Sequence, residues 1–155
     1  MSDNALFPVF EVPELIDESE QFDEKYKSSV AWDLEKGDFV RTGANQLIES
    51  PGRDTYRVWC IKTVLTERYA CAAYPDSVGT EMESALKEKS NGAVESAVER
   101  TITEALLINP RTEYVRGFSF TWNGDELYCS FTVKGIDWEE FPISATIGKS
   151  KQEMS

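Results

Sequence analysis

An alternation of apolar and polar residues in the last third of the chain constrains the fold more than any other feature. Apolar side chains occupy every second position in 118–122 and in 127–133, and Asn123-Gly124 separates the two runs. A period of two places the apolar side chains of a strand on one face, and Asn-Gly favours a two-residue type I′ turn. The pattern predicts an antiparallel hairpin that pairs Trp122 with Asp125 and keeps both apolar sets on one face.

A third alternating run follows at 141–147, where Phe141, Ile143, Ala145 and Ile147 are the apolar positions. Proline has no N–H group to donate to a neighbour, so Pro142 predicts an edge strand here. An edge strand is a template for strand addition by another chain. Phe141 and Ile143 are therefore candidate partner-binding residues.

Helical spacing of apolar residues in the middle of the chain predicts three helices, over 54–66, 81–89 and 93–107. The second begins at a Thr80-x-x-Glu83 sequence, which has the form of a capping box. Asn109-Pro110 ends the third, because proline excludes the helical conformation from the residue before it. The apolar stripe of the third helix is Val94, Ala97, Val98, Thr101, Ile102, Ala105 and Ile108.

Strands are also expected before the helices. Val30, Trp32 and Leu34 alternate with polar or small residues and predict a half-buried strand at 30–35, with a weaker strand at 46–49. Strands on both sides of a group of helices indicate an α+β fold. We expect a small antiparallel sheet with about three helices packed on one face, ending in the hairpin and an edge strand.

The N-terminal segment differs in composition from the rest. Residues 1–36 hold ten acidic side chains against three lysines. We predict a flexible acidic arm at 1–25, a single domain at 26–148 and a tail at 149–155. The apolar Leu6-Phe7-Pro8-Val9-Phe10 run makes this segment either a docking arm or a solvating tail, and both interpretations stay open.

Composition excludes several classes of function. A net charge of −12 repels phosphate groups, so we expect neither nucleic acid nor an anionic membrane as a partner. The chain has no histidine, which removes Ser-His-Asp and Cys-His catalysis and zinc sites of the HExxH type. Cys60, Cys71 and Cys129 form no CxxC pair, so we interpret them as small buried hydrophobic residues in a reducing compartment. No cofactor, metal or small-molecule substrate is expected.

One enzyme class survives without histidine. A glycoside hydrolase needs only two carboxylates that flank the bond. Glu95, Glu99 and Glu104 fall on the polar side of the third predicted helix, where hydration is the simpler explanation. Glu67 and Asp76 flank an irregular loop and are better candidates. A lysozyme-like cell-wall hydrolase is the alternative to a non-enzymatic protein.

Large aromatic residues gather in segments that have no regular pattern. Tyr69, Tyr74, Trp138 and Phe141 lie in predicted loops or at the predicted edge. They form a protein–protein hot spot if they are exposed, or they cap the ends of the core if they are buried. The residues alone do not separate these two alternatives.

Three stretches resemble a known family. They are Trp59-Cys60-Ile61-Lys62-Thr63-Val64-Leu65-Thr66-Glu67-Arg68-Tyr69 with Tyr74 and Gly79, then Glu99-Arg100 through Asn109-Pro110-Arg111-Thr112, and then Val115 with Phe118-Ser119-Phe120-Thr121-Trp122. Their order and spacing resemble the XkdS-type baseplate proteins of contractile-tailed prophages. That group in turn is similar to the baseplate wedge family long labelled "acidic lysozyme". The resemblance covers about residues 30–135.

The resemblance implies a structural, non-enzymatic part of a tail baseplate, assembled in the host cytoplasm and then carried in the virion tail. Implied partners are other baseplate wedge proteins, tail sheath and hub proteins. The family's Glu-Pro-Arg signature matches Asn109, Pro110 and Arg111, with asparagine in place of glutamate. With Tyr69 and Tyr74, these residues are the expected contacts. Arg111 also follows a helix C-terminus, where a cation is favoured without any partner.

Overall fold

The computed structural model describes residues 27–148 and 152–154. The predicted arm at 1–25 and most of the predicted tail at 149–155 lie outside the described residues. In chain order the elements are β1 (Ser29–Val30), β2 (Trp32–Asp33), β3 (Asp38–Phe39), β4 (Glu49–Ser50), α1 (Gly52–Leu65), α2 (Met82–Ala85), α3 (Asn91–Leu107), β5 (Thr112–Asn123), β6 (Glu126–Gly135), β7 (Phe141–Gly148) and β8 (Gln152–Met154).

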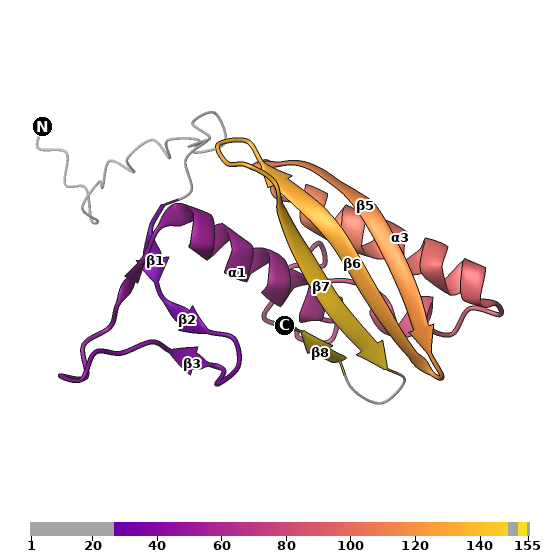
Figure 1. The fold of residues 1–155 in the computed structure, drawn as a ribbon, viewed down its shortest axis with the longest axis horizontal. Helices are drawn as coiled ribbons and strands as arrows, with labels where there is room; N and C mark the ends of the chain where they lie inside the picture. Colours follow the sequence, from indigo (N-terminus) through magenta and orange to yellow (C-terminus); the bar gives the residue numbers. More distant parts are fainter. Residues whose placement is uncertain (1–26, 149–151, 155) are drawn as a thin grey trace, which may run out of the picture.

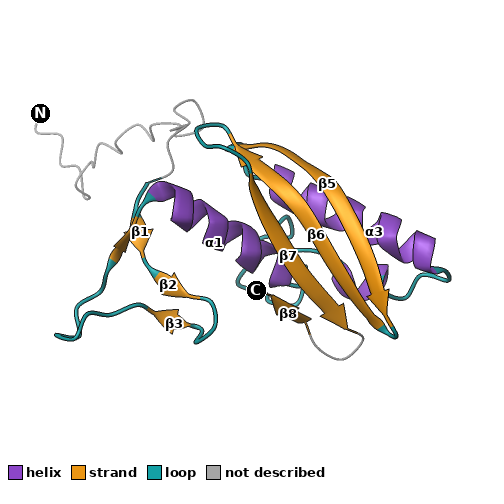
Figure 2. Ribbon diagram, in the orientation of Figure 1, coloured by secondary structure: helices purple, strands orange, loops and turns teal. Residues whose placement is uncertain are grey.

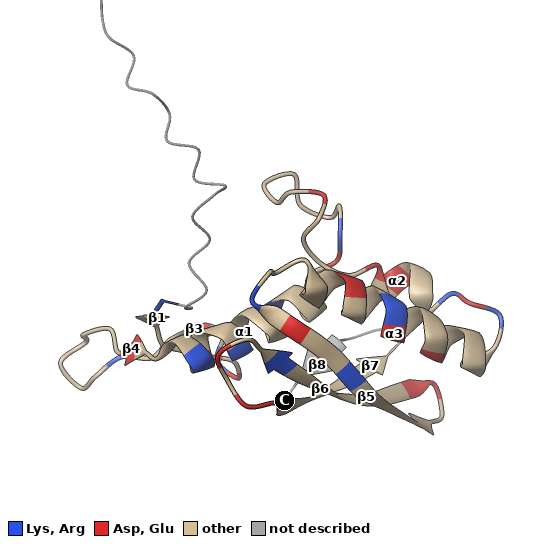
Figure 3. Cartoon of the chain, turned by 90° about the horizontal axis from the view of Figure 1, so that it is seen from above, with Lys and Arg blue, Asp and Glu red and all other residues tan. Residues whose placement is uncertain are grey.

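The main sheet is antiparallel, with four strands in the order β5-β6-β7-β8 (Figure 1). Helices and strands are segregated into two layers (Figures 2 and 3). The fold is therefore α+β with an antiparallel sheet, as the alternation of residues predicted.

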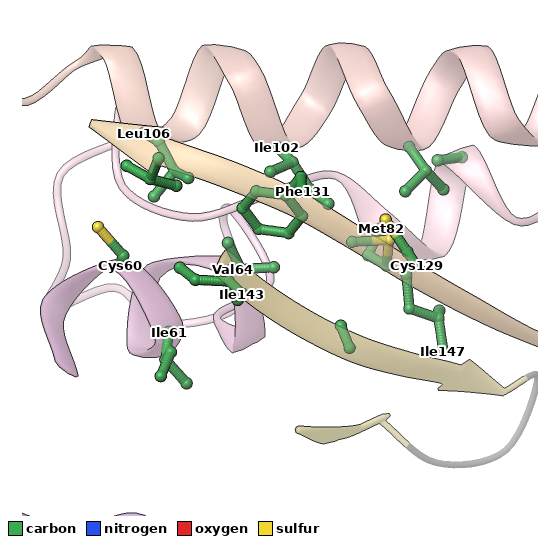
Figure 4. Close-up of a cluster of buried hydrophobic side chains, with 14 of the residues drawn as sticks. Cys60, Ile61, Val64, Met82, Ile102, Leu106, Cys129, Phe131, Ile143 and Ile147 are labelled. Atoms are coloured by element: carbon green, nitrogen blue, oxygen red, sulfur yellow. The ribbon is translucent and has the colours of Figure 1, made fainter. Parts of the chain in front are cut away.

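The core lies between the helices and one face of this sheet (Figure 4). All the alternating apolar residues of β6 and β7 are buried: Leu127, Cys129, Phe131 and Val133, and Phe141, Ile143, Ala145 and Ile147. Burying one such Leu, Ile or Phe side chain stabilises the fold by ~1.5–3 kcal/mol. Phe118, Phe120 and Trp122 of β5 are half-buried against the same cluster.

The predicted register of the hairpin is wrong by two residues, although its faces are right. Trp122 pairs with Leu127, not with Asp125, and Asn123 pairs with Glu126. The two-residue loop is thus Gly124-Asp125, and of these two residues only Gly124 has a positive φ, 62°. A shift of two preserves the period of a strand, so apolar side chains still oppose apolar side chains.

A bulge at Gly117 explains why the apolar positions of β5 change from odd to even numbers. Arg116 pairs with Thr132 and Ser119 pairs with Ser130, so two residues of β5 oppose one of β6. Gly117 has a φ of 71°, which favours glycine. The extra residue lets Val115 and Phe118 both pack against the core.

The prediction of an edge strand at 141–147 is only half right. Strand β8 pairs with the second half of β7, from Ala145 to Ile147. Pro142 lies in the first half, which β8 does not cover. The outer border of this side of the sheet is therefore β8 along one half and β7 along the other.

The predicted strand at 30–35 does not join the main sheet. It is divided into β1, which pairs with β4, and β2, which pairs with β3. We call these two small sheets together, residues 29–50, the ribbon module. It projects from the body of the molecule beside the start of α1 (Figure 1). Leu34 is 39% exposed in the turn between β2 and β3, so its predicted burial is wrong.

The predicted helix at 81–89 is only the four-residue α2, and its capping box does not form. The hydroxyl of Thr80 instead donates to the carbonyl of Val64 at the end of α1, at 3.0 Å. The first N–H groups of α2 are satisfied from elsewhere, by Thr101 Oγ1 of α3 and by the carboxylate of Glu67.

Helix α3 forms much as predicted, with one error in its apolar stripe. Ser90 caps its N-terminus by accepting from the N–H of Ala93, at 3.2 Å. Ile108 is 46% exposed because the helix ends at Leu107, and Leu106 is buried in its place. The other stripe residues are buried as predicted.

Candidate protein-interaction surfaces

The loop between α1 and α2 has a tightly held base. We call residues 67–79 the tyrosine loop. The N–H of Thr80 donates to the carbonyl of Thr66 and the N–H of Arg68 donates to the carbonyl of Thr80, both at 2.8 Å. The guanidinium of Arg68 adds a bond to the carbonyl of Gly79, at 3.0 Å, and an ion pair with Glu81, at 3.3 Å. The two ends of the loop are therefore fixed side by side.

Gly79 lets the two ends approach. A Cβ atom at this position would lie 2.5 Å from the carbonyl oxygen of Thr66, and the residue has a φ of +99°. Any side chain would collide with the backbone of the other end. The close approach and the positive φ both require glycine.

The tyrosine loop carries two exposed aromatic side chains, Tyr69 beside its base and Tyr74 near its middle. Tyr69 is 67% exposed and Tyr74 is 56% exposed, the highest values among the large apolar side chains of the described residues. Tyr69 also has a φ of 66°, in a region that costs a residue with a side chain about 1–2 kcal/mol. Of the two alternatives for these tyrosines, the structure supports exposure. The loop projects on the helix side of the molecule, away from the sheet (Figure 3).

The segment Asn109-Pro110-Arg111, which the sequence predicts to bind a partner, forms the corner between α3 and β5. Asn109 is buried, and its side-chain oxygen accepts from the N–H of Arg111, at 3.0 Å. Its carbonyl accepts from the N–H of Thr112, at 2.9 Å. The asparagine thus shapes the corner from within, while Pro110 is exposed and Arg111 is half-buried.

The outer edge of β5 is open within the described part of the chain. Strand β5 is terminal in the order of the main sheet and pairs only with β6 there. The bulge at Gly117 divides this edge in two. Beyond it, residues 119–123 pair with β6 without a further shift of register, so they present a regular edge.

The solvent-facing side of the main sheet carries a small charged network. The hydroxyl of Tyr114 donates to Glu140 at 2.8 Å, and the guanidinium of Arg116 donates to the same oxygen at 2.9 Å. The hydrogen bond from Tyr114 and then that from Arg116 lower the pKa of Glu140. The network joins β5 to the turn before β7.

Two predicted contact residues are not surface residues. Phe141 is 5% exposed and Ile143 is 2% exposed, since both point into the core from β7. Of the two alternatives for Phe141, the structure supports burial. The prediction that Phe141 and Ile143 bind a partner through strand addition stays a prediction. Trp138 is half-buried and stacks on Tyr56, with ring centroids 5.2 Å apart.

Two of the carboxylate candidates have structural roles, and Asp76 is exposed in the tyrosine loop. Glu67 accepts from the backbone of α2, and Glu95 accepts from the indole N–H of Trp122 at 2.7 Å. Within residues 27–148 and 152–154, no cluster of three acidic or sulfur ligands is arranged for a metal ion. None of the helices in that same part has the length and apolar character needed to cross a membrane.

Comparisons with known proteins agree on one family. A family model described as "Contractile injection system sheath initiator" matches residues 28–138. The phage-like element PBSX protein XkdS of Bacillus subtilis (strain 168) is 30% identical over 147 residues, which is 94% of this chain and 98% of that protein. The matched region includes the tyrosine loop, the corner and β5.

Proposed function

We propose, from the premise that the chain belongs to the contractile injection system sheath initiators, that it links a tail baseplate to the first ring of sheath. Family membership makes it a structural component of a phage-derived contractile tail, and confirms the resemblance to XkdS-type proteins. The link is non-enzymatic and is made by protein–protein contacts. No observation on the described residues favours the glycoside hydrolase alternative.

The open edge of β5 is the observation that carries this proposal. In an antiparallel pair, alternate residues direct their N–H and C=O groups away from the partner strand. Counted from the closing pair Asn123 and Glu126, the outward groups of β5 beyond the bulge are those of Phe120 and Trp122. Because they face the open edge, a strand from a sheath subunit can pair with them.

The tyrosine loop supplies a second surface in another direction. It projects on the helix side, whereas the open edge belongs to the sheet (Figure 3). A link needs two separate surfaces, and aromatic side chains on a loop with a fixed base lose little conformational entropy on binding. We assign the tyrosine loop and the Asn109-Pro110-Arg111 corner to the baseplate wedge and hub proteins, and the edge to the sheath.

The proposal includes the place of the protein in assembly. The chain joins the baseplate in the host cytoplasm, before the sheath polymerises, and remains in the tail of the finished particle. Sheath subunits then add to the strand edges, which a rotationally symmetric baseplate presents as a ring.

Electron microscopy of tail particles tests the baseplate contact. The double variant Tyr69→Ala, Tyr74→Ala removes both exposed aromatic side chains of the loop while the base of the loop keeps its bonds. Tyr128→Ala is the matched control, because Tyr128 is 45% exposed on the main sheet. We expect the double variant to give baseplates that lack this protein, and the control to give intact tails.

Arg111→Ala tests the corner in the same particles. If the corner contacts the baseplate, this variant assembles fewer sheathed tails, although the isolated protein keeps its native circular dichroism spectrum. Intact sheathed tails from both Arg111→Ala and the double tyrosine variant would contradict the assignment of these surfaces.

A further inference from the structure

The ribbon module exposes an unusual amount of apolar surface. Leu34, Phe39, Leu47 and Ile48 are between 38% and 51% exposed, all within residues 34–48. These residues lie outside the surfaces assigned above. Contiguous exposed apolar surface of this kind marks a binding site or a risk of self-association.

An apolar groove runs between the ribbon module and α1. Its first part, of about 240 Å³, is lined by Val30, Trp32 and Phe39 and by a helical stripe of α1 that includes Val58 and Trp59. A second part, of about 330 Å³, is lined by Leu47, Ile48 and Glu49. Ser29 and Val30 line both parts, so we treat them as one groove.

The wall of the groove is held in place by aromatic contacts. The rings of Trp32 and Phe39 meet edge to face, with centroids 5.0 Å apart. The ammonium group of Lys62 in α1 lies 3.6 Å from the centroid of the Trp32 ring. These contacts fix the wall without filling the groove, so the groove exists before any ligand arrives.

The charged residues that line the groove balance each other, because they are Lys62 and Glu49. Helix α1 carries Arg53, Arg57 and Lys62 against Asp54, a net charge of +2. Arg53 and Arg57 are not among the residues that line the groove. The apolar side chains of the lining therefore favour an apolar segment as the ligand.

The chain itself contains such a segment close by. Residues 1–26 hold eight acidic side chains and one lysine, a net charge of −7, and include the apolar run Leu6-Phe7-Pro8-Val9-Phe10. This segment joins the described part at residue 27, two positions before Ser29 of the groove. The sixteen residues between Phe10 and residue 27 reach up to ~50 Å, and a tether of this kind gives an effective concentration of about 1 mM.

We propose that residues 6–10 of the chain dock into the groove between the ribbon module and α1. The apolar side chains of this run fill the groove. The docked segment covers the apolar surface of the free protein and so prevents association through it before assembly.

Photocrosslinking of the full chain tests this docking. Phe7 is replaced by p-benzoylphenylalanine, and the protein is irradiated at low micromolar concentration. We expect crosslinks within one molecule, to peptides that contain residues 29–62. Phe39→Asp should lower the ratio of docked to undocked molecules by about tenfold. Tyr128→Asp is the control and should leave this ratio unchanged, because the Tyr128 side chain is about as exposed as that of Phe39 but lies on the main sheet.

Each other outcome overturns the proposal. Crosslinks between two chains would assign the groove to a second copy, and crosslinks to other parts of the same chain would place the segment elsewhere. The same crosslinking pattern in Phe39→Asp as in the parent would show that the groove is not the site. None of these results depends on whether the protein binds sheath or baseplate.

Discussion

Two residues, Gly79 and Thr80, hold the tyrosine loop against the C-terminal end of α1. Thr80 is polar and yet fully buried, because its hydroxyl donates to the carbonyl of Val64 at the C-terminus of α1. The last carbonyls of a helix have no partner within the helix. Thr80 supplies one for α1, and Gly79 beside it allows the backbone to come close enough.

Substitution of Gly79 should therefore be costly. Gly79→Ala places a Cβ atom 2.5 Å from the carbonyl oxygen of Thr66 at a φ of +99°. We expect the free energy of unfolding to fall by about 2–4 kcal/mol in urea titrations. Gly92→Ala is the control, because its Cβ would meet nothing within 4 Å in α3 and should change stability by about 1 kcal/mol or less. Equal effects of the two variants would contradict this explanation of the loop.

The three cysteines should differ in reactivity. Cys71 is exposed in the tyrosine loop, so the prediction that all three are buried is wrong for this residue. Burial raises the pKa of the Cys60 and Cys129 thiols to about 12, which leaves almost no reactive thiolate at neutral pH. A thiol reagent at pH 7.5 should label one cysteine per native chain and three in denaturant. Rapid labelling of either remaining thiol in the native Cys71→Ser variant would contradict the buried positions.

At the scale of elements, the sequence predicted the features that depend on the local pattern of apolar and polar residues. The period of two placed the apolar faces of β5, β6 and β7 correctly. Turn chemistry was less informative, because glycine can occupy either position of a two-residue loop. Gly124 takes the first position here, and the register moved by two residues as a result.

Helix caps show why other parts were not predictable. Thr80-x-x-Glu83 and the sequence at Ser90 both have a hydroxyl before a helix, but only Ser90 caps one. The N–H of Glu81 is bonded by Thr101, twenty positions away in the chain. A contact of this kind follows from tertiary packing and leaves no mark on the local sequence.

The contribution of the Ser90 cap to the stability of the protein should be measurable. Ser90→Ala removes the acceptor of the Ala93 N–H and should lower the free energy of unfolding by about 1 kcal/mol. Ser96→Ala, at an exposed position within α3, should be neutral or slightly stabilising because alanine is the better helix former. Circular dichroism during thermal unfolding compares the two variants. A loss at Ser96 as large as that at Ser90 would contradict the cap.

At the scale of the whole molecule, the sequence left open which of the large aromatic residues are exposed. Tyr69 and Tyr74 lie in an irregular segment, and the structure exposes both. Phe141 and Ile143 belong to a regular strand whose odd positions face the core, so the alternation itself already argued for burial. The alternation at 30–35 predicted strand here, but its division into the two small sheets of the ribbon module could not be foreseen, because strands of two residues are too short to show a period.

The arrangement of surfaces is consistent with the proposed role of joining two assemblies. The tyrosine loop projects from the helix layer, the corner lies between α3 and β5, and the strand edge belongs to the sheet layer (Figure 3). The layers are joined by one shared core, so the surfaces are held at fixed positions. Such rigidity suits a part on which the first sheath ring is built.

Amide hydrogen exchange of β5 tests strand pairing most directly, in the isolated protein and in purified sheathed tails. The account predicts that Phe120 and Trp122 exchange readily in the isolated protein and slow by about tenfold or more in the tail, because their outward N–H groups gain partners. Amides of β6, which has a strand on each side, should be protected in both states. Exchange at Phe120 and Trp122 that is the same in both states would contradict the claim that sheath assembly begins on this edge.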